Sequence, residues 1–127
     1  MSITQQIADA RWLYRSEHCR CAICHNPRIG ELECHHIAGR GTPQHEVAAN
    51  FLMICGAFGR GCGAHWQYHH GGLSQPDLHL GHILWAKQDA DGLVDLEWLA
   101  MLRHRKALTH EPERLPDWYI QRREANR

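Results

Sequence analysis

The sequence predicts an α+β fold, in which helices at both ends flank a short central segment rich in cysteine and histidine. Apolar side chains recur at helical spacing in residues 3–17, whereas residues 31–37 (ELECHHI) alternate in the way that strands do. The chain has only 127 residues, yet it contains six Cys and twelve His. Because a domain of this size often needs a metal ion or disulfides for stability, these two residue types are the most informative.

The N-terminal half is expected to contain a helix, one or two strands and a second helix. Residues 3–17 form the first helix, with Ser2 or Thr4 as its cap. Residues 31–37 form a strand, and the apolar run of residues 50–55 (NFLMIC) is either a second strand or the entry to a turn. Residues 63–70 then form a helix that ends at two glycines.

The C-terminal half is expected to be helical. Pro76 can start a helix that runs to about Asp89, and Asp95 can cap another through about Ala107. Leu115 and Pro116 introduce a short final helix. We therefore expect a single domain, 1–127, made of an N-terminal helix (1–18), a metal-binding core (19–72) and a C-terminal helical extension (73–127).

The charge balance gives little information about partners. Fourteen basic residues offset fourteen acidic ones, so no global positive field indicates a nucleic-acid ligand, and such an interpretation requires a local site. The first residues lack the apolar segment of a secretory signal, and no stretch has the length of a membrane span. We therefore expect the chain in a reducing cytoplasm, where clustered Cys more often bind metal than form disulfides.

Four cysteines in two pairs predict a structural zinc site. The first pair is Cys21-x2-Cys24, and the second, Cys55-x6-Cys62, encloses the Gly-rich segment GAFGRG. Two such pairs can present four thiolates around Zn²⁺ in the tetrahedral arrangement that structural zinc prefers. Scattered buried thiols are the alternative. Cys19 is close enough to replace Cys21 in the ligand set, and Cys34 lies in the strand pattern and is expected in the core.

The histidines predict a second metal site. His35 and His36 are adjacent at the end of the predicted strand, and His65 and His69 are four residues apart, which places both on one side of a helix. Three imidazoles, one from the strand and two from the helix, can hold a divalent cation and leave positions for water and substrate. The remaining imidazole of the adjacent pair is then available as a general base.

At these residues the chain resembles the HNH endonucleases, which contain a ββα-metal (His-Me finger) motif. The resemblance covers about residues 19–70 and is carried by CAIC, ECHHIAGRG, the asparagine in ANFLMICG, and GCGAHWQYHH. Many small phage and prophage members share this layout. The resemblance therefore implies a ββα-metal core with a four-cysteine zinc knuckle, and a nuclease encoded by a phage or prophage in a bacterial host.

The resemblance also assigns individual roles. His35 matches the first metal-ligand position, His36 matches the general base, and Asn50 matches the asparagine that holds the loop between the strands and so orients the base. His65 and His69 take the helix-ligand positions. Gly63 and Ala64 separate the last Cys from the first helix His, unlike in most members, so His70 remains an alternative to either of them. The catalytic cation is expected to be Mg²⁺, Mn²⁺, Ni²⁺ or Zn²⁺.

Together these features predict a metal-dependent endonuclease that hydrolyses DNA, with RNA as another possible substrate. Arg40 and Arg60, in the two Gly-rich loops, are candidates for contacts with phosphate. Phage packaging or recombination proteins are possible partners, and no membrane partner is expected. The alternative function is a zinc-stabilised nucleic-acid-binding or adaptor module that lacks catalysis.

Overall fold

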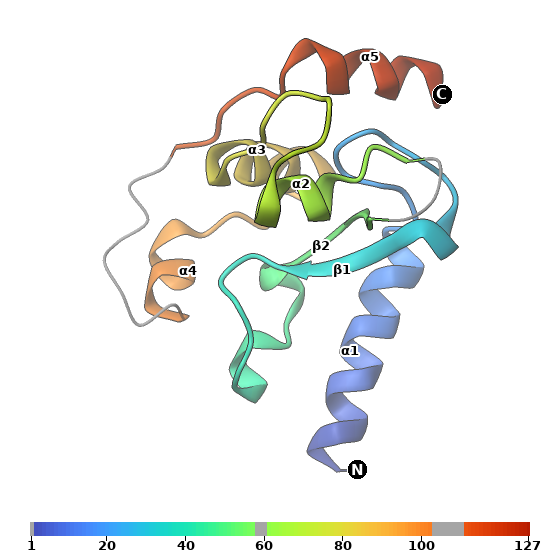
Figure 1. The fold of residues 1–127 in the computed structure, drawn as a ribbon. Helices are drawn as coiled ribbons and strands as arrows, with labels where there is room; N and C mark the ends of the chain where they lie inside the picture. Colours follow the sequence, from blue (N-terminus) through green and yellow to red (C-terminus); the bar gives the residue numbers. More distant parts are fainter. Residues whose placement is uncertain (1, 58–60, 103–110) are drawn as a thin grey trace.

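The protein has an α+β fold, described here by a computed structural model that covers residues 2–57, 61–102 and 111–127 (Figure 1). The predicted mixture of helices and strands is therefore confirmed. The helices and strands are, in chain order, α1 (Ile3–Glu17), β1 (Leu32–His36), β2 (Phe51–Cys55), α2 (Ala64–His70), α3 (Leu80–Ala90), α4 (Leu96–Leu102) and α5 (Asp117–Ala125). Among the described residues, none of these helices has the length and apolar character that a bilayer span requires.

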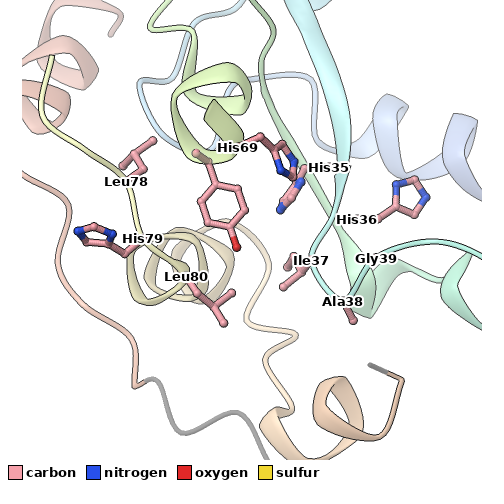
Figure 2. Close-up of a pocket in the computed structure, with 10 residues that line it drawn as sticks. His35, His36, Ile37, Ala38, Gly39, His69, Leu78, His79 and Leu80 are labelled. Carbon is pink, nitrogen blue, oxygen red and sulfur yellow. The ribbon is translucent and has the colours of Figure 1, made fainter. Parts of the chain in front are cut away.

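The strands β1 and β2 form a two-stranded antiparallel sheet. Leu32 lies opposite Cys55, and His36 lies opposite Phe51, so the apolar run of residues 50–55 contributes a strand rather than the entry to a turn. All of β2 is buried. Because successive side chains of a strand point to opposite faces, His35 and His36 leave β1 on different sides, as Figure 2 shows.

Helix α1 packs against one face of the sheet through its C-terminal half. Its start is capped as expected, since the hydroxyl oxygen of Ser2 accepts a hydrogen bond from the backbone N–H of Gln5 at 3.1 Å. Tyr14 is buried, and its ring meets that of Phe51 in β2 with 5.6 Å between centroids. Trp12 and Leu13 remain exposed, and Figure 1 shows the N-terminal end of α1 pointing away from the other elements.

Helix α3 begins at Leu80, so the predicted start at Pro76 is wrong. The backbone oxygen of Pro76 accepts a hydrogen bond from the hydroxyl of Tyr119 instead of entering a helix. His79 is the N-cap, with extended backbone, and its N–H donates to Nδ1 of His82 at 2.9 Å. The preference of Pro for the first position of a helix therefore does not decide where α3 begins. The start coincides instead with the contacts of His82 and Tyr119 to this segment.

A buried lysine ties α3 to the sheet. The ammonium group of Lys87 donates to the backbone oxygens of Ala48 at 2.6 Å and Phe51 at 2.8 Å, and it pairs with Asp91 at 2.5 Å. Tyr14 of α1 also donates to Asp91, at 2.7 Å. Since a buried charge is stable only when paired and hydrogen-bonded, this network specifies how α1, β2 and α3 meet.

The C-terminal helix packs on the first cysteine pair. Arg123 of α5 donates to the backbone oxygens of Ala22 at 2.7 Å and Ile23 at 2.9 Å, and Asn126 donates to that of Cys24 at 2.9 Å. In α4 the side chain of Asp95 caps the first turn as predicted; the expected continuation to about Ala107 extends beyond the described residues. The C-terminal extension therefore directly supports the segment that carries the first cysteine pair.

Candidate metal centres

The four predicted cysteines form one compact cluster. The sulfur atoms of Cys21, Cys24, Cys55 and Cys62 all lie within 4.8 Å of one another. The Cys21–Cys62 and Cys24–Cys55 sulfur distances are 3.9 and 3.6 Å. A tetrahedral site of four thiolates with Zn–S bonds of about 2.3 Å has sulfur atoms about 3.8 Å apart. The cluster therefore has the dimensions of a structural zinc site.

The surroundings of the cluster also suit thiolate ligands. The sulfur of Cys21 accepts backbone N–H groups of Ile23, Cys24 and Cys55, each at 3.4 Å, and hydrogen bonds from the neighbouring thiols, Cys21 first, lower the pKa of Cys24. Gly61 is required here because a Cβ atom would collide with the sulfur of Cys55. All four cysteines are almost fully buried, so the site is closed, as structural zinc sites are.

The other two cysteines lie outside this cluster. Cys19 is exposed, and the structure places Cys21 in the cluster instead. Cys34 is only half-buried, although it packs against the core, and burial raises its pKa to about 11. Neither thiol therefore belongs to the four-cysteine cluster.

The structure also brings together three of the predicted histidines. One ring nitrogen from each of His35, His65 and His69 lies within 4.8 Å of the others, and the ring centroids are 4.8 to 5.2 Å apart. His35 comes from β1 and the other two from successive turns of α2. His70, the alternative ligand, instead has its ring against Trp66, with 4.2 Å between centroids. We call His35, His65 and His69 the histidine triad.

Two observations indicate that the triad fits a metal ion. The Nε2 atom of His35 is buried and has no hydrogen-bond partner among the described residues, which is costly for a polar atom unless a ligand satisfies it. Burial, followed by the charges of His65 and His69, lowers the pKa of His35 to about 3. Its imidazole is therefore neutral at pH 7, the form that binds metals.

Glu33 orients His65 within the triad. Its carboxylate accepts a hydrogen bond from Nδ1 of His65 at 2.5 Å, so Nε2 is the nitrogen left to bind a cation. A carboxylate in this position commonly fixes the tautomer of a metal-binding histidine. The absence of a side chain at Gly56 makes this possible, because a Cβ atom there would collide with Glu33.

His36 belongs to a separate network on the other face of β1. Its Nε2 lies 3.0 and 3.1 Å from the two carboxylate oxygens of Glu46. Arg11 of α1 binds the same carboxylate through two donors, at 2.5 and 2.7 Å. These contacts, that of Arg11 first, lower the pKa of Glu46 to about 2. An ionised carboxylate only accepts hydrogen bonds, so Nε2 of His36 carries a proton.

The second ring nitrogen of His36 takes no part in this network. Nδ1 is buried and has no hydrogen-bond partner among the described residues. Burial lowers the pKa of His36, opposed by the hydrogen bond to Glu46, so the ring is mostly neutral at pH 7. A neutral ring with its proton on Nε2 has its lone pair on Nδ1.

Asn50 holds the loop that follows β1. Its amide oxygen accepts the backbone N–H of Ala38 at 2.6 Å, and its amide nitrogen donates to the backbone oxygens of Gly39 at 3.1 Å and His45 at 2.9 Å. The residue is fully buried. Asn50 thus has the loop-fixing contacts that the sequence led us to expect.

A cavity of about 670 Å³ adjoins both histidine networks. Its lining includes His35, His36 and His69 from the two networks, and Leu78 and His79 from the segment before α3 (Figure 2). Arg40 is exposed in the adjoining loop, and its charge contributes to the lowered pKa of both His35 and His36. Arg60 lies outside the described residues. The cavity can therefore admit a ligand that contacts the triad.

Comparisons of the chain with protein-family models, with curated proteins and with solved structures find no match. Any functional assignment therefore depends on the residues of this chain and on their geometry.

Three residues of the site were not predicted from the sequence. Glu33 had a signal, because a strand places it on the same face as His35. Glu46 and Arg11 had none, since they are separated by 35 positions and charged residues are common on protein surfaces. Only the packing of α1 against the sheet brings Arg11 to Glu46.

Proposed function

We propose that this chain is a metal-dependent HNH-type endonuclease that hydrolyses phosphodiester bonds in DNA. The observation that carries the proposal is the convergence of His35, His65 and His69, two of which, His35 and His69, line a cavity that His36 also lines. Three imidazoles leave coordination positions for water and substrate, in contrast to the closed cysteine cluster. The chain order β1, β2, α2, with triad residues on β1 and α2, supports a ββα-metal core.

In this proposal His36 removes the proton from the attacking water. Glu46 accepts the hydrogen bond from Nε2 of His36 and keeps the ring oriented, and Arg11 keeps Glu46 ionised. The lone pair on Nδ1 accepts the proton as the water oxygen attacks phosphorus in line with the leaving 3′ oxygen. The bond between phosphorus and the 3′ oxygen breaks, and the 3′ oxygen takes a proton from solvent. The resemblance to HNH nucleases implies products with 5′-phosphate and 3′-hydroxyl ends.

The other residues position the substrate. His35, His65 and His69 would hold a divalent cation such as Mg²⁺, Mn²⁺, Ni²⁺ or Zn²⁺, which would supply charge stabilisation for the scissile phosphate and the departing oxygen. Asn50 keeps the backbone of Ala38 and Gly39 fixed beside His36. Arg40, exposed on the same loop, contacts a flanking phosphate.

Plasmid cleavage by the zinc-loaded protein in each of the four cations tests the proposal. His36→Ala should lower the cleavage rate by about 10²- to 10⁴-fold, the usual contribution of a general base, while DNA binding and zinc content stay unchanged. His25→Asn is the matched control. This substitution removes an imidazole that does not line the cavity beside His35, His36 and His69. The variant should cleave at the wild-type rate.

The result also separates the nuclease from the alternative function. Cleavage by His36→Ala at the wild-type rate would contradict the role of His36. If no cation supports nicking but the wild-type protein retards DNA in a gel at low salt, the zinc-stabilised binding module is the better description. A parallel assay with RNA decides between the two nucleic acids. The phage origin and the packaging or recombination partners remain proposals that depend on the resemblance alone.

A further inference from the structure

Trp66 is an exposed indole on α2, directly after the triad residue His65. It keeps 45% of its surface exposed, whereas every residue of the neighbouring strand β2 is buried. Its ring lies against His70, one helical turn away, with 4.2 Å between centroids and a tilt of 39°. The indole is therefore held in place by a neighbour on its own helix and not by the core.

Trp66 also shares a hollow with two of the triad residues, His65 and His69. This second hollow, of about 280 Å³, is lined by Glu33, Ala57, His65, Trp66, His69 and His70. The ring centroids of His65 and His69 are 4.8 Å apart, and those of His69 and His70 are 6.3 Å apart. A row of rings thus connects the indole to the candidate cation site.

The chemistry of this hollow suits a nucleobase next to a phosphate. Aromatic planes bind bases by stacking, and one such contact contributes about 1–3 kcal/mol. Because the chain has equal numbers of acidic and basic residues, it lacks the broad electrostatic attraction that supplies most non-specific affinity for DNA. A stacking contact therefore has a larger share of the binding energy here than in a basic protein.

We infer that Trp66 stacks on the base of an unpaired nucleotide whose phosphate lies at the triad, so that single-stranded or locally unpaired DNA is the preferred substrate. In a duplex both faces of each base are covered by its neighbours, and only an unpaired, terminal or extruded base offers a face to an indole. The inference rests on the proposed nuclease function for the position of the phosphate. Stacking itself requires no cleavage and can be measured separately.

The test compares two oligonucleotides that differ only in their bases. The zinc-loaded protein, without added catalytic cation, is titrated with a short oligothymidylate and with an abasic strand of the same length, and binding is followed by fluorescence anisotropy. Trp66→Ala should weaken binding of oligothymidylate by about 5- to 100-fold, the loss of one base–aromatic stack. Binding of the abasic strand should not change, and Trp66→Phe should retain most of the affinity.

Trp12→Ala is the matched control. Trp12 is more exposed than Trp66, at 69%, but it lies on α1 and lines neither hollow of the triad. Its removal should leave both affinities unchanged, which excludes a general effect of losing an exposed indole.

Several results would overturn the inference: no binding of oligothymidylate by the wild-type protein, equal weakening of both strands by Trp66→Ala, or tighter binding of duplex than of single-stranded DNA. Selective loss of oligothymidylate binding without cleavage in any cation would support stacking and contradict the nuclease proposal. Cleavage of duplex and single-stranded DNA at equal rates, unaffected by Trp66→Ala, would support the nuclease and contradict stacking.

Discussion

The cysteine cluster and the histidine triad are built in the same way but differ in access to solvent. Each joins residues near the first strand to residues from a later segment. The four cysteines expose no more than 2% of their surfaces, whereas the triad borders a cavity and His69 is exposed. In metal sites generally, a closed set of ligands serves stability and an open set leaves space for a substrate, so the difference predicts a structural role for the cluster and an open site at the triad.

The two centres are also physically connected. Cys55 ends β2, and the next residue, Gly56, leaves the space that the carboxylate of Glu33 occupies beside His65. The antiparallel pairing of β2 with β1 places His35. We therefore expect that loss of the cysteine cluster disturbs the sheet and, through it, the triad, whereas loss of a triad histidine leaves the cluster intact.

The largest expected effect follows from replacing a cysteine of the cluster. Cys24→Ser should release the zinc and abolish cooperative thermal unfolding. Structural zinc contributes on the order of 10 kcal/mol, comparable with the whole stability of a small domain. Zinc content and circular dichroism melting check this result. Cys19→Ser, at an exposed cysteine outside the cluster, should behave as wild type, and a normally melting, zinc-loaded Cys24→Ser protein would contradict the structural role.

The next effect distinguishes the open centre from the closed one. His69→Ala removes one of three imidazoles and should weaken binding of the added cation by roughly 100-fold or more. Loss of a residue that only hydrogen-bonds to a metal ligand already lowers metal affinity by about 10- to 100-fold, and loss of a ligand itself should cost at least as much. The melting temperature should change little, since His69 is exposed. Calorimetric titration with Ni²⁺ or Mn²⁺ and thermal melts measure both. His70→Ala is the control, and unfolding of His69→Ala would show the triad to be structural.

A smaller effect is expected at the carboxylate that orients the triad. Glu33→Gln keeps the size of the side chain but weakens the hydrogen bond to Nδ1 of His65. Affinity for the added cation should fall by about 10- to 100-fold, with full zinc content in the cysteine cluster. Glu97→Gln, at an exposed position on α4, should change nothing. Unchanged cation affinity in Glu33→Gln would show that the contact between Glu33 and His65 is a surface ion pair with no role in cation binding.

The sequence predicted those parts of both centres that depend on local spacing. Cys21-x2-Cys24 is one turn of chain, and His65 and His69 share a helical face whatever the surrounding fold. The convergence of each local pair with a partner more than 25 residues away was inferred from metal chemistry, and the structure brings these side chains together. The roles of the histidines as ligands and base remain predictions.

Interactions between distant elements explain most of what the sequence did not predict. Helix α3 starts at Leu80, and the backbone oxygen of Pro76 instead accepts a hydrogen bond from Tyr119 of the last helix. Arg11 orients His36 through Glu46 only after α1 packs on the sheet. In both cases the decisive partner is an ordinary polar residue with no distinctive spacing, so a local pattern cannot indicate it.

The smallest expected effect concerns the backbone at His25, directly after the first cysteine pair. This residue has a left-handed conformation, whereas His35 of the triad lies in an extended strand. His25 has a φ of 61°, a left-handed conformation that costs an L-residue about 1–2 kcal/mol. His25→Gly removes this cost but adds about 0.5–1 kcal/mol of chain entropy to the unfolded state. The net gain in unfolding free energy should be about 1 kcal/mol or less, measured by urea denaturation of the zinc-loaded protein.

His25→Ala is the control for this change, because it removes the imidazole without relieving the backbone and should give no gain. Neither variant should alter binding of the added cation, since His25 is not part of the triad. Equal stabilisation by Gly and Ala would attribute the effect to the loss of the imidazole and not to the backbone. A change in cation affinity with normal zinc content would instead show that the conformation of the turn at His25 affects the triad. The cysteine cluster would then influence the triad by a path other than loss of the cluster and disturbance of the sheet.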